Sequence, residues 1–144
     1  MIAQQVLRRP GALLVVALPL SVDELLKDFH SSESRVQFRD LLSSASKVIE
    51  VATHQSRASN YKAAGEYVVH NADVLLVVWD GKPAHGEGGT GEVVELARNL
   101  RLPIAWVHAG NRKPGTDEPT SLGDEQGRVE FERLDQLKDL LKPR

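Results

Sequence analysis

The chain of 144 residues contains no cysteine, which excludes disulfide scaffolds, thiol nucleophiles and cysteine-ligated zinc sites. It also lacks a long hydrophobic run, because the longest, Ala12–Leu20, is too short to cross a bilayer. The basic pair Arg8-Arg9 precedes this run, but no small-residue cleavage site follows, so no secretory signal is predicted. From these absences we expect a cytoplasmic protein that has no membrane partner.

The chain also lacks a large excess of either positive or negative charge. The chain carries 18 basic and 20 acidic residues and a formal net charge of −2, which gives no electrostatic reason to expect a nucleic-acid partner. Its five histidines show no spacing typical of metal ligands, so neither a metal nor a cofactor is predicted. They are His30, His54, His70, His85 and His108. Hydrophobic residues make up 41% of the chain, as in an ordinary globular domain.

Four apolar segments rich in β-branched residues are predicted to be strands. They are Ala12–Leu18, Lys47–Ala52, Val74–Trp79 and Pro103–His108. Three of them are continuously apolar, which is typical of parallel strands covered on both faces. The second alternates between apolar and polar residues and is therefore predicted to lie at an edge of the sheet.

Segments with helical periodicity separate these strands. They are Val22–Phe29, Glu33–Ser44, Asn60–His70 and Glu92–Leu100, and Ser21 and Ser32 are the expected N-caps of the first two. Alternation of strands and helices predicts right-handed crossovers. We therefore expect an α/β fold with a Rossmann-like, doubly wound sheet of about four mainly parallel strands in the order 2-1-3-4.

The C-terminal third has a different composition. Residues 1–109 are predicted to form the α/β domain, and residues 110–128, rich in glycine, proline and charge, a polar loop or linker. Within residues 129–144, Phe131, Leu134, Leu137 and Leu141 follow helical spacing. This pattern predicts a C-terminal amphipathic helix that docks either on its own domain or on a second subunit.

The segment Trp79–Glu95 is the most informative for function, because it runs from a buried strand through five glycines into a helix. Helix N-termini offer free amide donors, and glycines allow a backbone to approach an anion closely. We therefore predict a phosphate-binding loop, although a flexible strand-to-helix connection would also explain the glycines. The predicted ligand-binding residues are Trp79, Gly81, Gly86, Gly88, Gly89, Thr90 and Gly91.

Two carboxylates flank this loop. Glu92 lies in the first turn of the following helix, where it could stabilise the helix dipole, contact ribose hydroxyls or act at a glycosidic carbon. Asp80 follows the strand directly and could accept backbone amides or bind a ligand hydroxyl, although an Asp-Gly turn explains it equally well. Glu92 and Asp80 are the candidate catalytic residues if the chain is an enzyme.

The run from Tyr61 to Val107 resembles the C-terminal half of the SLOG superfamily of Rossmann-like domains. This superfamily includes DprA/Smf and the "lonely guy" phosphoribohydrolases. The resemblance covers about residues 12 to 108 and is most specific at Trp79-Asp80-Gly81 and Gly88-Gly89-Thr90. It also implies that the first two strand–helix units of the family are missing from this chain.

The resemblance implies a module that binds a nucleotide or NAD-derived ligand by its phosphate and acts as a sensor. Some members cleave N-glycosidic bonds of nucleoside phosphates with a glutamate, for which Glu92 is the match. A third possibility is a non-catalytic domain for dimerisation or interaction. Since the missing units would leave the pocket shallow, we expect a homo-oligomer or a partner subunit to complete it.

Overall fold

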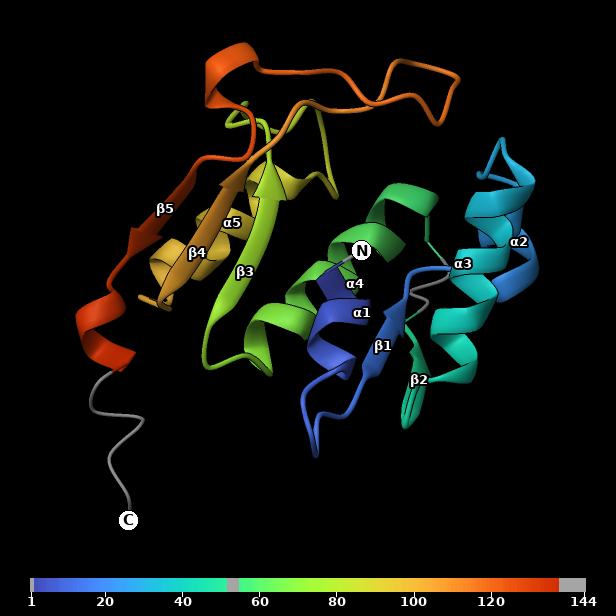
Figure 1. Cartoon of the computed structure of the whole chain (residues 1–144), viewed down its shortest axis with the longest axis horizontal. Helices are drawn as coiled ribbons and strands as arrows, with labels where there is room; N and C mark the ends of the chain where they lie inside the picture. The colour runs from blue at the N-terminus through green and yellow to red at the C-terminus, as the bar shows by residue number, and fades with distance from the viewer. Residues whose placement is uncertain (1, 52–54, 138–144) are drawn as a thin grey trace.

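The structure, a computed structural model, describes residues 2–51 and 55–137 of the chain and has a mixed α/β fold (Figure 1). Its helices are α1 (Ile2–Leu7), α2 (Val22–Leu26), α3 (Ser32–Ser43), α4 (Arg57–His70) and α5 (Thr90–Asn99). Its strands are β1 (Val15–Leu18), β2 (Lys47–Glu50), β3 (Leu75–Trp79), β4 (Ile104–His108) and β5 (Val129–Glu132). Short 3-10 turns, η1 (Gly123–Glu125) and η2 (Leu134–Gln136), flank β5. None of the described helices has the length and apolar character that crossing a bilayer requires.

The strands form two sheets. β1 pairs in parallel with β2, with Val15 opposite Lys47. In the second sheet β4 lies in the middle, parallel to β3 and antiparallel to β5. The predicted neighbours 2-1 and 3-4 are therefore present, but the described strands β1 and β3 are not hydrogen-bonded, so the expected continuous sheet 2-1-3-4 is wrong at its centre. β1 has only four residues and can form few hydrogen bonds with a neighbouring strand. The two sheets are instead joined by α4, which packs against both β1 and α5.

Local sequence signals locate most of the elements. All four predicted strands are present, and each of the four helices predicted between them overlaps a helix of the structure. The Ser21 hydroxyl caps α2 by accepting a hydrogen bond from the Glu24 amide, as its position predicts. The cap of α3 is Ser31 rather than Ser32, because it is Ser31 that accepts from the amide three residues on. His54, one of the five histidines considered above as metal ligands, lies outside the described residues.

The predicted helix over residues 129–144 is wrong at its beginning, where Val129–Glu132 form β5. The four residues Val-Glu-Phe-Glu alternate with period two, and β4 offers an unpaired edge on which they add as an antiparallel strand. The helical spacing of Phe131 and Leu134 therefore spans a strand and a 3-10 turn. The rest of the predicted helix, residues 138–144, lies outside the described residues.

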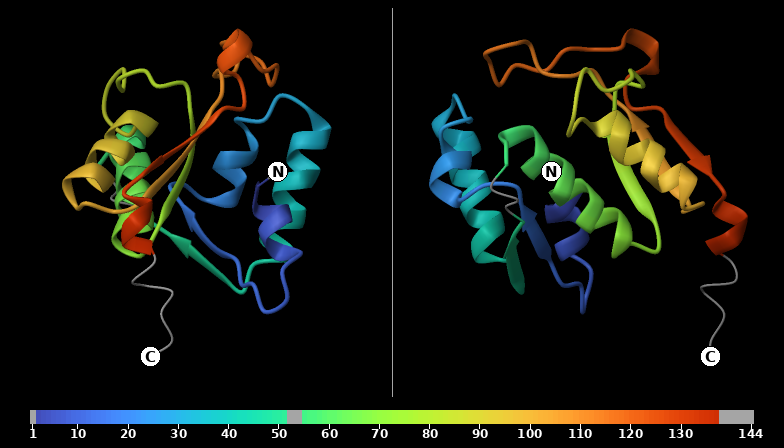
Figure 2. Two further views of the ribbon diagram at one scale, coloured as in Figure 1. Left: turned by 60° about the vertical axis from the view of Figure 1, so that its left-hand side comes forward. Right: turned by 180° about the vertical axis from the view of Figure 1, so that it is seen from behind.

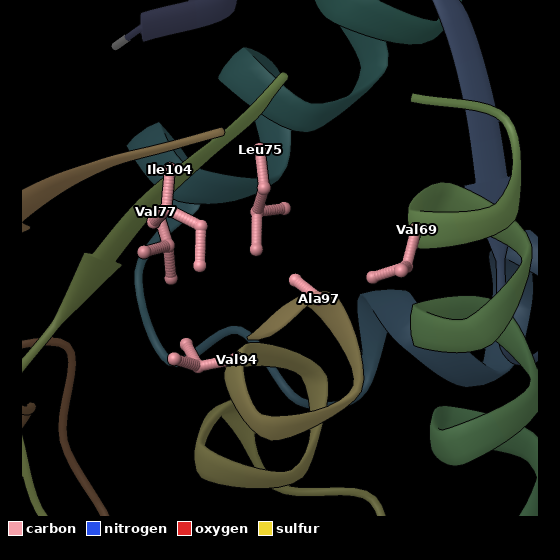
Figure 3. Packing of buried hydrophobic residues seen from close by; sticks show 6 residues of the cluster. All are labelled: Val69, Leu75, Val77, Val94, Ala97 and Ile104. Atoms are coloured by element: carbon pink, nitrogen blue, oxygen red, sulfur yellow. The ribbon is translucent and has the colours of Figure 1, made fainter. Parts of the chain in front are cut away.

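The hydrophobic core lies between α4, α5 and one face of the sheet β3–β4–β5 (Figure 3). Val69 of α4 and the α5 residues Val94 and Ala97 pack against strand residues on this face. The strand residues are Leu75, Val77 and Ile104. α5 thus lies behind this sheet in Figure 1 and in front of it in the right-hand view of Figure 2. This packing fixes the start of α5, and hence the glycine loop, relative to the carboxyl end of β3.

The segment between β4 and β5 is ordered by contacts with the N-terminal half. It turns back on itself at a bridge between Arg112 and Pro119 and arches over the molecule toward α2 and α3 (Figures 1 and 2). The Asp117 carboxylate accepts hydrogen bonds from the backbone amides of His30 and Ser31 at 3.0 and 2.7 Å. The hydrogen bond from the Ser31 amide holds the pKa of Asp117 below its usual value. Residues 110–128 therefore link the end of β4 to the connection between α2 and α3 in the N-terminal half.

An ion pair fixes β5 against α5. The Arg98 guanidinium donates from Nη2 to the Glu132 carboxylate at 2.6 Å and from Nε at 3.1 Å. These hydrogen bonds lower the pKa of Glu132 from its ordinary 4.5, against a smaller opposing effect of partial burial. Because the folded pKa lies below the unfolded one, the pair stabilises the fold above about pH 4.5, and this contribution is lost as the pH falls through the folded pKa.

We therefore expect Glu132→Gln to lower the free energy of unfolding by about 1 kcal/mol at neutral pH. The difference from wild type should shrink toward zero when the pH is lowered past the pKa of Glu132. Urea unfolding at neutral and acidic pH measures the loss of stability and its dependence on pH. Glu66→Gln is the matched control, because the exposed carboxylate of Glu66 forms no ion pair within the described residues. An equal loss for the two variants at neutral pH would contradict this assignment.

Candidate functional site: a cleft at the carboxyl ends of β3 and β4

A cleft of about 990 Å³ opens where β3 and β4 end. Three segments line it: the first turns of α4, the end of β3 with the glycine loop, and the four residues that follow β4. Each segment follows the carboxyl end of a strand: α4 follows β2, the glycine loop follows β3, and the third segment follows β4. Ligands of α/β folds bind at the carboxyl ends of parallel strands. The volume of the cleft is near the upper end of the range of about 300–1,000 Å³ for small-molecule sites in proteins.

The predicted ligand-binding residues lie at this cleft or directly behind it. Trp79, Gly86, Gly88, Gly89 and Thr90 line the cleft. Gly81 and Gly91 line a smaller cavity of about 450 Å³, which also contacts Trp79 and Gly86. The fold thus brings the predicted loop residues together around two adjacent hollows.

Packing of the loop explains two of these glycines. Gly88 has a φ of +86°, and a Cβ atom built on it would lie 2.7 Å from the Ala58 carbonyl oxygen in the first turn of α4. A Cβ atom on Gly91 would lie 2.7 Å from the Ala84 backbone nitrogen. Both contacts are with backbone atoms, which cannot move away as a flexible side chain can. The loop therefore needs glycine at these positions to fold back on itself and on α4.

The backbone amides of the loop differ in whether they already have a hydrogen-bond acceptor. The Gly88 amide donates to the Glu92 carboxylate at 2.5 Å, so it is already occupied. The N-cap of α5 is Gly89, with an extended φ of −83° and ψ of 160° and no capping side chain. The positive end of the α5 dipole therefore faces the cleft without a side-chain acceptor at the cap, beside Thr90, the first helical residue.

The two predicted catalytic carboxylates differ in position. Glu92 lines the 450 Å³ cavity and a hollow of about 210 Å³ beside α4, and it is not among the residues that line the large cleft. Asp80 does line the cleft, and its Oδ1 atom accepts a hydrogen bond from the Lys82 amide at 3.0 Å. This is a turn of the kind that an Asp-Gly pair favours. In this arrangement Glu92 holds the loop, and Asp80 shapes its first turn.

Two tryptophan side chains hold the start of the glycine loop by hydrogen bonds to its backbone. The Trp79 indole donates to the Lys82 carbonyl at 3.0 Å, and the Trp106 indole donates to the Trp79 carbonyl at the same distance. The two rings lie 5.0 Å apart, and Trp106 stacks on the buried His108. The carboxyl end of β3 and the first residues of the loop are thereby fixed.

Basic side chains converge on the cleft from all three of its walls. Arg57 comes from the start of α4, Lys82 and His85 from the loop, and Arg112 from the segment after β4. Arg57 pairs with Asp28, and Arg112 lies 3.3 Å from Asp117. The Lys82 ammonium has no ion pair within the described part of the chain. The cleft wall also carries the acidic side chains of Asp80 and Glu87. Because Arg57 and Arg112 are paired, Lys82 is the cation of this group that is left to attract an anion.

Tyr61 adds an aromatic surface to the same wall. Its hydroxyl donates to Asp28 at 3.3 Å, and the Arg57 guanidinium lies 5.7 Å from its ring centroid. Burial, followed by the nearby Asp28 charge, raises the pKa of Tyr61 above its ordinary 10. Tyr61 is therefore a protonated donor at neutral pH, with part of its ring available to a planar group in the cleft.

Arg57, Tyr61, Lys82 and Arg112 were not predicted as site residues from the sequence. Position along the fold could have indicated two of them. Arg57 begins the helix after β2, and Arg112 lies four residues after the end of β4, so both belong to the edge that holds the glycine loop.

Comparison with protein-family models, curated proteins and solved structures finds no significant match to this chain. The resemblance to the SLOG superfamily therefore stays a prediction. A function for this chain has to be inferred from the geometry of the cleft.

Proposed function

We propose that the cleft binds a phosphate-bearing nucleotide or NAD-derived ligand, with the phosphate between the glycine loop and the basic side chains. One observation carries the proposal: four basic side chains from three separate segments line the same cleft as Gly89 and Thr90, the N-cap and first residue of α5. A phosphate accepts hydrogen bonds from such groups and is favoured by the helix dipole. In this proposal the fold is a Rossmann-like module of the SLOG type.

The sugar and base have their own surfaces in this proposal. Tyr61 gives the cleft an aromatic side chain on which a planar base can stack. Asp80 is the carboxylate of the cleft wall that can accept hydrogen bonds from ribose hydroxyls. The volume of about 990 Å³ accommodates a ligand with two phosphates and a nucleoside.

We propose binding rather than cleavage as the function. An N-glycosidase of the predicted kind needs its glutamate at the anomeric carbon, within reach of the bound sugar. Glu92 instead lines the hollows behind the loop, and its carboxylate is engaged by the Gly88 amide. A sensor or ligand-presenting role requires only the cleft and its cations.

The test is a set of calorimetric titrations of the full chain with ADP-ribose, NAD, ADP, AMP and adenosine. We expect the phosphate-bearing ligands to bind with an affinity that falls as salt is added, and adenosine to bind at least about tenfold more weakly. No heat and no thermal shift with any phosphate-bearing ligand would contradict the proposal.

Lys82→Ala is expected to weaken binding of the phosphate ligands by about tenfold, since it removes one charge-assisted contact. Lys47→Ala is the matched control, because Lys47 is an exposed lysine of β2 outside the cleft. Titration of both variants with ADP-ribose measures the difference. If Lys82→Ala binds as tightly as Lys47→Ala, the phosphate does not lie beside the glycine loop.

A further inference from the structure

The sheet β3–β4–β5 has one face that no described helix covers. Figure 1 views the sheet from this side, with α5 behind it. The register places Leu76 beside Ala105 and Phe131 in one row, and Val78 beside Val107 and Val129 in the next. All six positions of these rows are apolar. We call this surface the open face.

The orientation of β5 is the unusual feature of the open face. An antiparallel strand with one face on the core normally turns its apolar side chains inward and its polar ones to solvent. β5 does the reverse: Glu130 and Glu132 lie on the α5 side of the sheet, where Glu132 pairs with Arg98 and Glu130 with Arg128. Phe131 and Val129 face outward and are 58% and 46% exposed. A shift by one residue would reverse every side chain, so these ion pairs keep the apolar side outward.

The exposed apolar area lies in the range of the largest apolar patch on a typical monomer, and patches of this size are often interaction sites. Leu76, Val78, Val129 and Phe131 are each about half exposed, with values from 46% to 58%. With about 200 Å² for each whole side chain, they expose roughly 400 Å² together, and Ala105 and Val107 between them add to this. A standard interface buries about 800 Å² per partner, and about 65% of a homodimer interface is apolar, which corresponds to roughly 500 Å². The open face therefore supplies most of the apolar area that one side of a dimer needs.

We infer that a second copy of this chain covers the open face, so that two sheets pack face to face around a two-fold axis. Because the six central positions carry no charge, the face meets its own copy without repulsion, as an isologous interface requires. The net charge of −2 adds little long-range repulsion between copies. Face-to-face packing of two sheets places them about 10 Å apart, with the apolar side chains interdigitated.

The dimer would also reach the candidate site. Val78 belongs to the open face and lines the large cleft. A copy packed on Val78 therefore lies beside the cleft mouth and narrows it. The dimer itself rests only on the open face and stands or falls independently of ligand binding.

Light scattering and sedimentation of the ligand-free chain test the inference. We expect a species of twice the 15.9 kDa chain mass at micromolar concentrations. Phe131→Asp and Val129→Asp should each raise the dimer dissociation constant at least about 100-fold, since each places two charges in the interface. Val48→Asp is the matched control, because Val48 is also a strand valine with 46% exposure but lies on β2, in the other sheet. It should leave the dimer intact.

Two results would overturn the inference: a wild-type chain that is monomeric at about 100 µM, or a dimer that Phe131→Asp leaves unchanged. Should both aspartate variants fail to fold by circular dichroism, thiol cross-linking decides instead. The chain has no cysteine, so Val129→Cys introduces a unique thiol. A short bismaleimide should join two copies of Val129→Cys and should not join copies of Val48→Cys. Equal cross-linking of the two would assign the contact to another surface.

Discussion

Ile104→Ala is expected to lower the free energy of unfolding by about 3–4 kcal/mol. Ile104 is the largest of the fully buried side chains, with 0% exposure, in the core between β4 and α5 (Figure 3). Truncation removes three buried carbons and leaves a cavity that close-packed neighbours such as Val94 and Ala97 cannot fill. Urea unfolding followed by far-UV circular dichroism measures the loss.

Ile2→Ala is the matched control for this substitution. Ile2 lies on α1 with 41% exposure, so its truncation removes little buried surface and should cost less than about 1 kcal/mol. Similar losses for Ile104→Ala and Ile2→Ala would mean that the core does not lie between α5 and the sheet β3–β4–β5. The position of the glycine loop would then be wrong as well, because α5 carries it.

Gly88→Ala is expected to cost about 2–3 kcal/mol of stability and to weaken phosphate binding at least about tenfold. Two effects add: alanine is strained at a φ of +86°, and its Cβ would lie 2.7 Å from the Ala58 carbonyl oxygen. The loop must then move away from α4, which displaces Gly89 and the start of α5 from the cleft. Thermal unfolding and titration with ADP-ribose measure the two consequences.

Gly115→Ala separates these effects. Gly115 has a φ of +72°, and a Cβ atom added to it would have no neighbour within 4 Å, so only the backbone strain of about 1 kcal/mol should appear there. The excess loss in Gly88→Ala then measures the close approach of the loop to α4. If the two variants lose equal stability and both bind ADP-ribose normally, the loop does not pack on α4 as described.

Local sequence patterns predicted most elements of the fold because apolar runs and caps act over a few residues. These patterns gave wrong predictions where the structure of a segment depends on contacts with residues far away in the sequence. In Val129–Glu132 a four-residue alternation competed with a longer helical spacing, and the free edge of β4 resolved the conflict in favour of a strand. The separation between β1 and β3 likewise depends on contacts between segments far apart in the chain.

The candidate site shows the same limit. The glycine loop was visible in the sequence as a cluster at a strand end, and the structure places its residues around the cleft and the smaller cavity behind it. The basic residues Arg57 and Arg112 were not predicted, because they come from other segments of the chain. Only their positions after strand ends pointed to the site. Glu92 was predicted as a candidate catalytic residue from its position in the first turn of the helix after the loop and from the resemblance, with helix stabilisation as the alternative. The direction of its side chain, toward the Gly88 amide, depends on how the loop folds back.

The most direct test of the proposed function is an NMR titration of the ¹⁵N-labelled full chain with ADP-ribose. Binding at the loop predicts that the largest amide shifts occur at Gly86, Gly89 and Thr90, together with the side-chain resonances of Arg57 and Arg112. The amides of β2 should change little. Shifts confined to other elements, or none at saturating ligand, would contradict the assignment of the cleft as a phosphate-binding site.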